Sequence, residues 1–335
     1  MSFLEVRRGD IYTKYGLDSV VFDSLQFEDE WGERLRQAGY SNMSADIIAE
    51  AHNREYLSSQ MTDDTVAAVN EGETLVSAKN AEEFQHKVST VRIRESFERL
   101  VDLRTCREAD EGTWTFTKGK YHEACGEWAG RDKLFLVRES VSSRLSQLAL
   151  SLSHIDTKIN FEDGFRPLGV QEGLFIRRIA MAKASHPEWT DEELLLEARS
   201  KTAYTPRFAA HKAGAAVDVR LYSASSGDFY DIGHDYPDGG EIVRLNTEFV
   251  TQHQWQNRKI LEHMARASGL FMYPYEDWHL CYGDATAAVV GSPCADDYTA
   301  KYGPVKLYDS KRGKIQATYD QDELDEVFPF TAREM

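Results

Sequence analysis

The 335-residue sequence contains few cysteines and no long apolar run, and its basic side chains are outnumbered by acidic ones. The four cysteines, Cys106, Cys125, Cys281 and Cys294, form neither a CxxC pair nor the dense framework of a small disulfide-bonded protein. We therefore expect free thiols and a reducing compartment.

Positive charge is scarce enough to exclude two classes of partner. The chain carries 39 Lys and Arg against 56 Asp and Glu, a formal net charge of −17. Such an excess repels phosphate backbones and anionic lipid headgroups. We expect neither nucleic acid nor a membrane surface as a partner, and nothing in the composition indicates an oligomeric state.

Apolar runs of the length that targeting or membrane insertion requires are also missing. The first residues, MSFLEVRRGDIY, contain no apolar core of a signal peptide, and no later window approaches a membrane span. A cytoplasmic protein is expected on these grounds.

What the chain does contain is 41% hydrophobic residues and patterns typical of both helices and strands. Its length exceeds the usual size of a single core, so one large domain, or one domain with an extension, is expected. Periodicity predicts helices over 46–57, 81–88, 140–153, 172–184, 191–200 and 247–268, and strands within 63–80 and over 113–116, 158–163 and 270–284. Helix 140–153 would bury a stripe made of Val141, Leu145, Leu148 and Leu152.

One stretch, Arg207–Tyr222, places hard polar groups in an apolar context. His211 and Asp218 lie among small residues in a run that leads into a β-prone segment, and we expect both side chains on one face of an extended chain. A buried aspartate costs several kcal/mol unless it is paired or binds a metal. The stretch therefore predicts a site, although either residue alone is compatible with a structural role.

A second polar pair, Glu276 and His279, follows some sixty residues later. Two histidines and one carboxylate leave a fourth position on zinc open for water, and a remaining carboxylate can serve as the base. Spacing alone does not exclude His234, His253 or His263 as ligands, nor a non-haem Fe(II) oxygenase that uses the same ligand types.

Three separated motifs narrow these alternatives. They are Asp163-Gly-Phe-Arg166-Pro167, His211-Lys-Ala-Gly214-Ala-Ala-Val-Asp218 and Glu276-Asp-Trp278-His279. In this order they resemble the zinc D-alanyl-D-alanine dipeptidases of the VanX kind, and the likeness runs from about residue 134 to 307. Gln256-Asn257-Arg258 and Tyr282-Gly283-Asp284 extend it.

The resemblance implies an α+β fold of the D-Ala-D-Ala metallopeptidase and Hedgehog-like type, with a small, mostly antiparallel sheet flanked by helices. It implies Zn²⁺ bound by His211, Asp218 and His279, with Glu276 as the general base. Arg166 would stabilise the oxyanion of a small dipeptide-like substrate, in the first instance D-Ala-D-Ala. Residues 1–120 would form an N-terminal extension of unknown role, and residues 121–335 the catalytic domain.

Two positions depart from the pattern of that family. Ala209 stands where the family has a serine that helps to hold the substrate carboxylate, and alanine has no hydrogen-bonding side chain. Pro237 stands where the family has an aspartate for the substrate ammonium, with Asp235 and Asp238 close by. Hydrolysis of a cell-wall peptide or a modified peptide-like metabolite, and a non-catalytic binding module, are therefore retained as alternatives to a free dipeptide.

Overall fold

The computed structural model describes residues 83–237, 239, 241–247, 250–291 and 298–328. The predicted helix over 46–57 and the strands within 63–80 lie outside these residues. Of the predicted helix over 81–88, residues 83–89 are described and are helical.

A five-stranded sheet carries most of the predicted site and has the order β3-β5-β6-β8-β7. Its strands are β3 (Trp114–Phe116), β5 (Thr157–Asp163), β6 (Ala216–Ser223), β7 (Phe271–Met272) and β8 (His279–Cys281). Only β3 and β5 are parallel, and the other neighbouring pairs are antiparallel. The sheet is therefore small and mostly antiparallel, as expected.

The register of this sheet aligns three polar residues from three adjacent strands. Asp218 in β6 is paired with Asp163 in β5 on one side and with His279 in β8 on the other, and the β5 pairing contains an irregularity just before Asp163. Side chains directly opposite each other in a sheet lie on the same face. Asp163, Asp218 and His279, which are far apart in the sequence, therefore lie in one row across the sheet.

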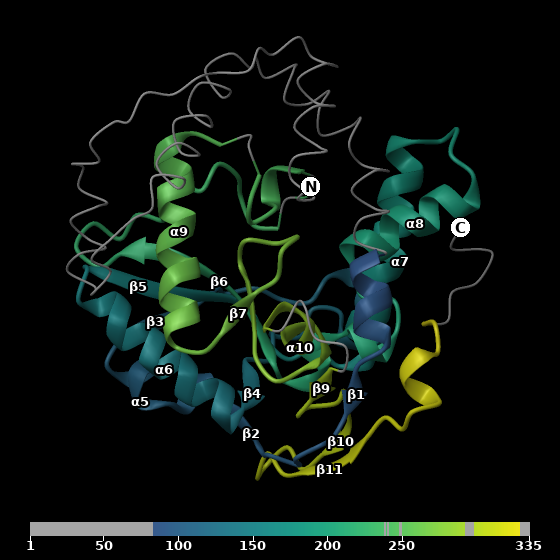
Figure 1. The fold of residues 1–335 in the computed structure, drawn as a ribbon, viewed down its shortest axis with the longest axis horizontal. Helices are drawn as coiled ribbons and strands as arrows, with labels where there is room; N and C mark the ends of the chain where they lie inside the picture. Colours follow the sequence, from purple (N-terminus) through teal and green to yellow (C-terminus); the bar gives the residue numbers. More distant parts are fainter. Residues whose placement is uncertain (1–82, 238, 240, 248–249, 292–297, 329–335) are drawn as a thin grey trace.

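Helices flank the sheet on its sides (Figure 1). The α-helices with assigned bounds are α5 (Arg107–Asp110), α6 (Glu139–Ser153), α7 (Leu168–Ser185), α8 (Asp191–Lys201), α9 (Gln252–Ala267) and α10 (Ala285–Gly291). Helices α6 and α9 contact each other, α6 also contacts β5, and α7 packs against α8. Short 3₁₀ helices are η1 (Leu103–Thr105), η2 (Glu123–Trp128), η3 (Pro206–Phe208), η4 (Ala210–Ala213), η5 (Glu241–Val243) and η6 (Glu323–Asp325).

The main core lies between the sheet and the pair α6 and α9. All four residues of the predicted stripe on α6, Val141, Leu145, Leu148 and Leu152, have no exposed surface. Each such side chain contributes about 1.5–3 kcal/mol on burial, so this stripe fixes α6 on the sheet. The predicted helix over 140–153 is confirmed.

Two helices begin with capping boxes. Thr190 caps α8 as expected, and its hydroxyl and the Glu193 side chain exchange hydrogen bonds with backbone N–H groups. Helix α9 begins at Gln252, five residues later than predicted, because Thr251 and Gln254 form the same motif there. Gly269 follows its end with a φ of +73°, in line with its predicted capping role.

Three two-stranded sheets lie outside the central one. They pair β1 (Arg92–Ile93) with β9 (Thr299–Ala300), β2 (Leu100–Asp102) with β4 (Leu136–Arg138), and β10 (Val305–Tyr308) with β11 (Ile315–Thr318). Strand β3, which precedes the predicted domain boundary at residue 120, hydrogen-bonds to β5 in the central sheet. The last part of the predicted extension is therefore joined to the catalytic unit, and the role of the rest stays open.

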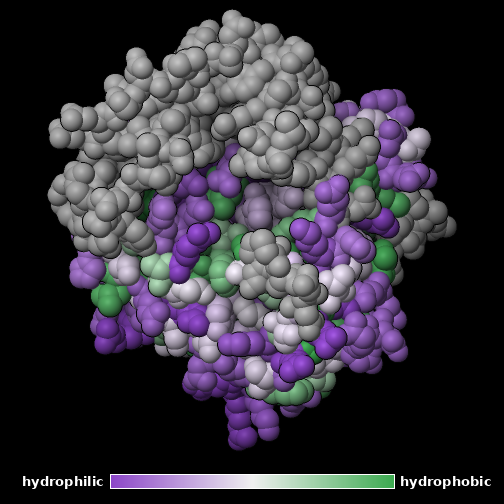
Figure 2. Space-filling model, in the orientation of Figure 1, coloured by the Kyte–Doolittle hydropathy of each residue, from purple (hydrophilic) through white to green (hydrophobic). Residues whose placement is uncertain are grey.

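The described surface in Figure 2 is mostly hydrophilic, with apolar residues in scattered patches. Within the described residues, no helix combines the length and the apolar character that crossing a membrane would need. Cys106, Cys125 and Cys281 are free thiols, as predicted, and Cys294 lies outside the described residues.

Candidate active site

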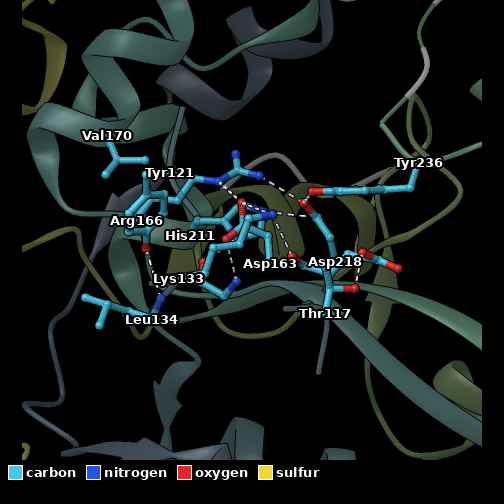
Figure 3. A network of polar contacts seen from close by, with 12 residues as sticks. Thr117, Tyr121, Lys133, Leu134, Asp163, Arg166, Val170, His211, Asp218 and Tyr236 are labelled. Atoms are coloured by element: carbon cyan, nitrogen blue, oxygen red, sulfur yellow. Dashed lines mark hydrogen bonds and ion pairs between the residues drawn. The ribbon is translucent and has the colours of Figure 1, made fainter. Parts of the chain in front are cut away.

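Three buried side chains converge at the row across the sheet. His211 Nε2 lies 3.1 Å from Asp218 Oδ1, His279 Nδ1 lies 3.0 Å from the same oxygen, and the two nitrogens are 3.2 Å apart. His211, Asp218 and His279 are 4%, 1% and 6% exposed. The structure thus brings together the three residues that the sequence proposed as ligands (Figure 3 shows two of them, His211 and Asp218).

His211 reaches this point in a different way from the one predicted. It lies in η4 and not on a strand, whereas Asp218 lies on β6. The two residues are seven positions apart, so a continuous strand would direct them to opposite faces. The expectation of one extended face was wrong, and the turn between them brings the side chains together.

The turn depends on Gly214 and on a buried arginine. Gly214 has a φ of +66°, and a Cβ there would meet Leu100 Cδ2 at 2.5 Å, so only glycine fits. Arg138 donates from Nε to Ala213 O at 2.7 Å, and its backbone N–H donates to Gly214 O at 2.7 Å. Two further hydrogen bonds join Arg138 to the carboxylate of Glu95, so residues of the N-terminal part hold the turn from behind.

The spacing of the three donor atoms fits a tetrahedral metal. Bonds of about 2.0–2.2 Å at tetrahedral angles put ligand atoms roughly 3.3 Å apart, close to the observed 3.0–3.2 Å. His211 Nδ1 lies 2.7 Å from Gly164 O, a contact that needs the proton on Nδ1 and leaves the lone pair of a neutral ring on Nε2. A proton placed between two of the three atoms forms a hydrogen bond between those two only. A metal cation at the centre of the triangle would be bound by all three.

The second oxygen of Asp218 is held by two other groups. Arg166 Nη2 donates to Asp218 Oδ2 at 2.9 Å and Tyr236 Oη donates to it at 3.0 Å, from opposite sides in Figure 3. Arg166 Nε also donates to Asp163 Oδ2 at 3.0 Å. These bonds orient the carboxylate so that Oδ1 faces the histidines.

Electrostatics keep Asp218 and Arg166 ionised. Burial alone would raise the pKa of Asp218, but His211, His279 and Arg166 together lower it well below the usual range. For Arg166, burial opposes the charged form, and the charges of Asp163 and Asp218 outweigh it and raise the pKa. Asp218 is therefore anionic, as a metal ligand would have to be, and Arg166 stays a cation beside it.

Glu276 lies next to the triangle but outside it. It occupies the loop between β7 and β8, and its Oε2 is 3.7 Å from His279 Nδ1. Burial raises the pKa of Glu276, the Asp218 charge adds to this, and His279 opposes it. The carboxylate is close enough to act on a molecule bound at the triangle, and its raised pKa suits proton transfer.

Two cavities open onto the cluster and meet at Arg166, Glu276, Lys201 and Thr202, which line both. The smaller, about 610 Å³ with its open mouth, is also lined by Phe84, Ala209 and Tyr273. The larger, about 1260 Å³ counted in the same way, extends past Asp218 and Tyr236 towards α7. A substrate that spans both would place its central bond beside Arg166 and Glu276.

The positions that depart from the family pattern line these cavities. Ala209, 2% exposed, faces the smaller cavity with Ala210. Pro237 lines the larger one, Asp235 is exposed, and Asp238 lies outside the described residues. The walls around the reacting centre therefore depart more from the family pattern than the centre does.

The other candidate histidines lie elsewhere. His234 Nε2 contacts both oxygens of Asp277 at 2.9 and 3.0 Å, and Arg258 Nε is 3.0 Å from the second oxygen. His253 contacts Asn257 on α9. His263, also on α9, is half-buried and belongs to no metal-like group among the described residues.

Several residues of the site were not foreseen from the sequence. Tyr236 gave no signal beyond its place before Pro237, and Asp163 and Asp277 were seen only as parts of motifs. The contact of His211 with Gly164 O is made by a backbone atom, which no residue pattern reveals.

Comparison with known proteins agrees with these observations. Residues 125–300, more than half of the chain, match the family model Peptidase M15, described as D-Ala-D-Ala dipeptidase. A comparison with curated proteins gives no match. The chain therefore belongs to the M15 peptidase family, and it is a metal-dependent peptidase with the mixed α+β fold of that family.

Proposed function

We propose that this protein is a zinc-dependent hydrolase that cleaves the peptide bond of a small dipeptide-like substrate, D-Ala-D-Ala or a related dipeptide. The observation that carries the proposal is the triangle of His211, Asp218 and His279, with a free-standing carboxylate at its edge. Two histidines and one carboxylate are a ligand set of catalytic zinc sites, which keep a fourth position open.

Zinc held by these three residues would lower the pKa of a bound water molecule towards ~7. Glu276 is placed to take a proton from that water and to return it to the leaving amine. Its raised pKa favours the first step, because a base that is too weakly basic would not accept the proton.

Arg166 is assigned to the carbonyl of the scissile bond. Its guanidinium is fixed by Asp163 and Asp218 and lines both cavities, so its charge is oriented before a substrate arrives. A fixed donor at a developing oxyanion typically accounts for about 10²–10³ in rate.

A second candidate is hydrolysis of a longer or modified peptide, such as a cell-wall peptide. The larger cavity continues past Asp218 and Tyr236 to α7, away from the reacting centre, and the Ala209 side chain supplies no hydrogen bond for a terminal carboxylate. Both candidates use the same reacting groups and differ only in what the walls bind.

The test is an assay of zinc-loaded protein on D,D-, L,D- and L,L-dipeptides and on N-acylated amides, with a chelated sample as the control. The proposal predicts zinc-dependent release of amine from at least one of the free dipeptides. Release only from the N-acylated amides would favour the second candidate, and no zinc-dependent release from any compound of the panel would contradict both.

A further inference from the structure

The larger cavity is lined by an unusual number of cations for a protein with a net charge of −17. Six of its residues are basic: Lys120, Lys133, Arg166, Arg177, Arg178 and Lys201. A cleft wall with an excess of one sign of charge concentrates ligands of the opposite sign.

Three of these cations are already engaged by the protein. Arg166 pairs with Asp163 and Asp218, Lys133 donates to Glu162 O at 2.8 Å, and Lys201 pairs with Glu197 one helical turn earlier. These three side chains therefore already make contacts that hold the site together.

Arg177 and Arg178 on α7 are different. Neither has an ion-pair or hydrogen-bond partner among the described residues, and both are only partly exposed. Burial lowers the pKa of Arg178, so desolvation disfavours its charged form. A partly buried guanidinium whose N–H donors are unused is suited to bind a carboxylate, to which it can donate two parallel hydrogen bonds.

Four acidic side chains share the cavity and offset its positive charge only in part, since Asp163 and Asp218 pair with Arg166. Glu162 accepts hydrogen bonds from Thr117 and Asn160 at the opposite wall. Glu276 lies at the junction with the smaller cavity and beside the triangle, and its charge offsets part of that of Arg178 without a hydrogen bond or ion pair between them. The wall formed by α7 therefore remains a cationic surface that faces the substrate space.

We propose that the larger cavity binds an anionic group of the substrate, in addition to its terminal carboxylate, through the guanidinium of Arg178 with Arg177 beside it. This rests on the proposed function and narrows the substrate class to peptides with an acidic side chain or an acidic acyl group. The predicted ligand chemistry is a carboxylate, since both arginines present planar, bidentate donors.

The experiment measures binding separately from hydrolysis. Zinc-loaded protein with Glu276→Gln is titrated by calorimetry with two matched pairs, D-Glu-D-Ala against D-Gln-D-Ala, and D-Ala-D-Glu against D-Ala-D-Gln. Within each pair only the charge changes, and the inference predicts that at least one glutamyl peptide binds about 10- to 100-fold more tightly than its amide, the range expected for a hydrogen-bonded charged group.

Adding Arg178→Ala or Arg178→Gln should reduce that preference to within about threefold, and Arg177→Ala should reduce it less. Lys183→Ala, a cation at an exposed position of the same helix, is the matched control and should leave the preference unchanged. A melting curve of each variant shows that it is folded.

Equal binding of acid and amide in both pairs, no binding of either glutamyl peptide, or a preference that survives the loss of both arginines would overturn the inference. Its failure is distinct from that of the proposed function. Hydrolysis without charge preference would leave a hydrolase with a neutral substrate, and charge preference without hydrolysis by the unaltered enzyme would leave an anion-binding site without the proposed reaction.

Discussion

Two histidine–carboxylate clusters lie close together in this protein and differ in how their charges are balanced. In the first, His211 and His279 face one oxygen of Asp218, and the two ring nitrogens are 3.2 Å apart. In the second, His234 and Arg258 both contact Asp277, and Arg258 supplies a permanent cation. Adjacent residues, Glu276 and Asp277, belong to different clusters.

The difference shows which cluster is suited to a metal. Asp277 already has a cation and a histidine on its oxygens, and Arg258 also donates to the carbonyls of Ile232 and Arg244. This cluster holds the loop before α9 in place, and its carboxylate is already balanced without a metal. The first cluster brings two imidazole nitrogens onto one carboxylate oxygen, an arrangement that a shared cation completes.

The largest contrast is expected between His211→Ala and His234→Ala. The first removes one of three metal-binding atoms, so zinc content should fall from about one per chain to near zero and activity should be lost with it. The second removes a structural contact and should retain zinc. Elemental analysis after gel filtration measures both, and stoichiometric zinc in His211→Ala would move the site elsewhere.

The next contrast uses neighbouring residues. Glu276→Gln should lower kcat about 10²–10⁴-fold with zinc and stability retained, because it removes only the proton acceptor. Asp277→Asn should retain most of kcat and lose about 3 kcal/mol of stability, because the fully buried Arg258 loses its counter-ion. Steady-state kinetics and denaturant unfolding separate the two, and an active Glu276→Gln would refute the assigned base.

The two arginines give a third contrast. Arg166→Gln should lower kcat about 10²–10³-fold, since it removes a fixed donor at the reacting carbonyl. Arg258→Gln should act on stability, by about 3–5 kcal/mol, because it leaves Asp277 and two carbonyls without their donor. If Arg166→Gln altered stability alone, its role would be structural.

The smallest effect is expected at Ala209. Ala209→Ser restores a hydroxyl on the wall of the smaller cavity and should lower KM for a free dipeptide by up to about tenfold, the value of one hydrogen bond. The amidated dipeptide, which has no terminal carboxylate, is the matched substrate and should show no change. An equal effect on both would mean that the cavity does not receive the carboxylate.

The three motifs, through their resemblance to the dipeptidase family, led to the three residues that the structure brings together. Each motif is local in the chain, as are the small residues around His211. The buried stripe of α6 has a clear helical period. The start of α9 was displaced by five residues, because the capping box at Thr251 outweighs the apolar pattern that precedes it.

What escaped prediction depends on contacts distant in the chain. Arg138 lies 75 residues before Ala213, the residue whose carbonyl it binds, and Tyr236 reaches Asp218 from a loop without a regular pattern. Arg178 was not singled out because an arginine on a helix usually faces solvent, and only the packing of α7 places it on the cavity. The position of His211 in a 3₁₀ turn likewise depends on Gly214, which ends that turn and lies close to Leu100. Residue periodicity does not reveal such a contact.

The central claim is that His211, Asp218 and His279 bind one zinc ion, and anomalous scattering from zinc-loaded crystals tests it most directly. Data collected on the two sides of the zinc absorption edge should give one strong difference peak, about 2.0–2.2 Å from His211 Nε2, Asp218 Oδ1 and His279 Nδ1. A peak beside His234 and Asp277 instead, or no peak at the triangle of a loaded crystal, would contradict the account.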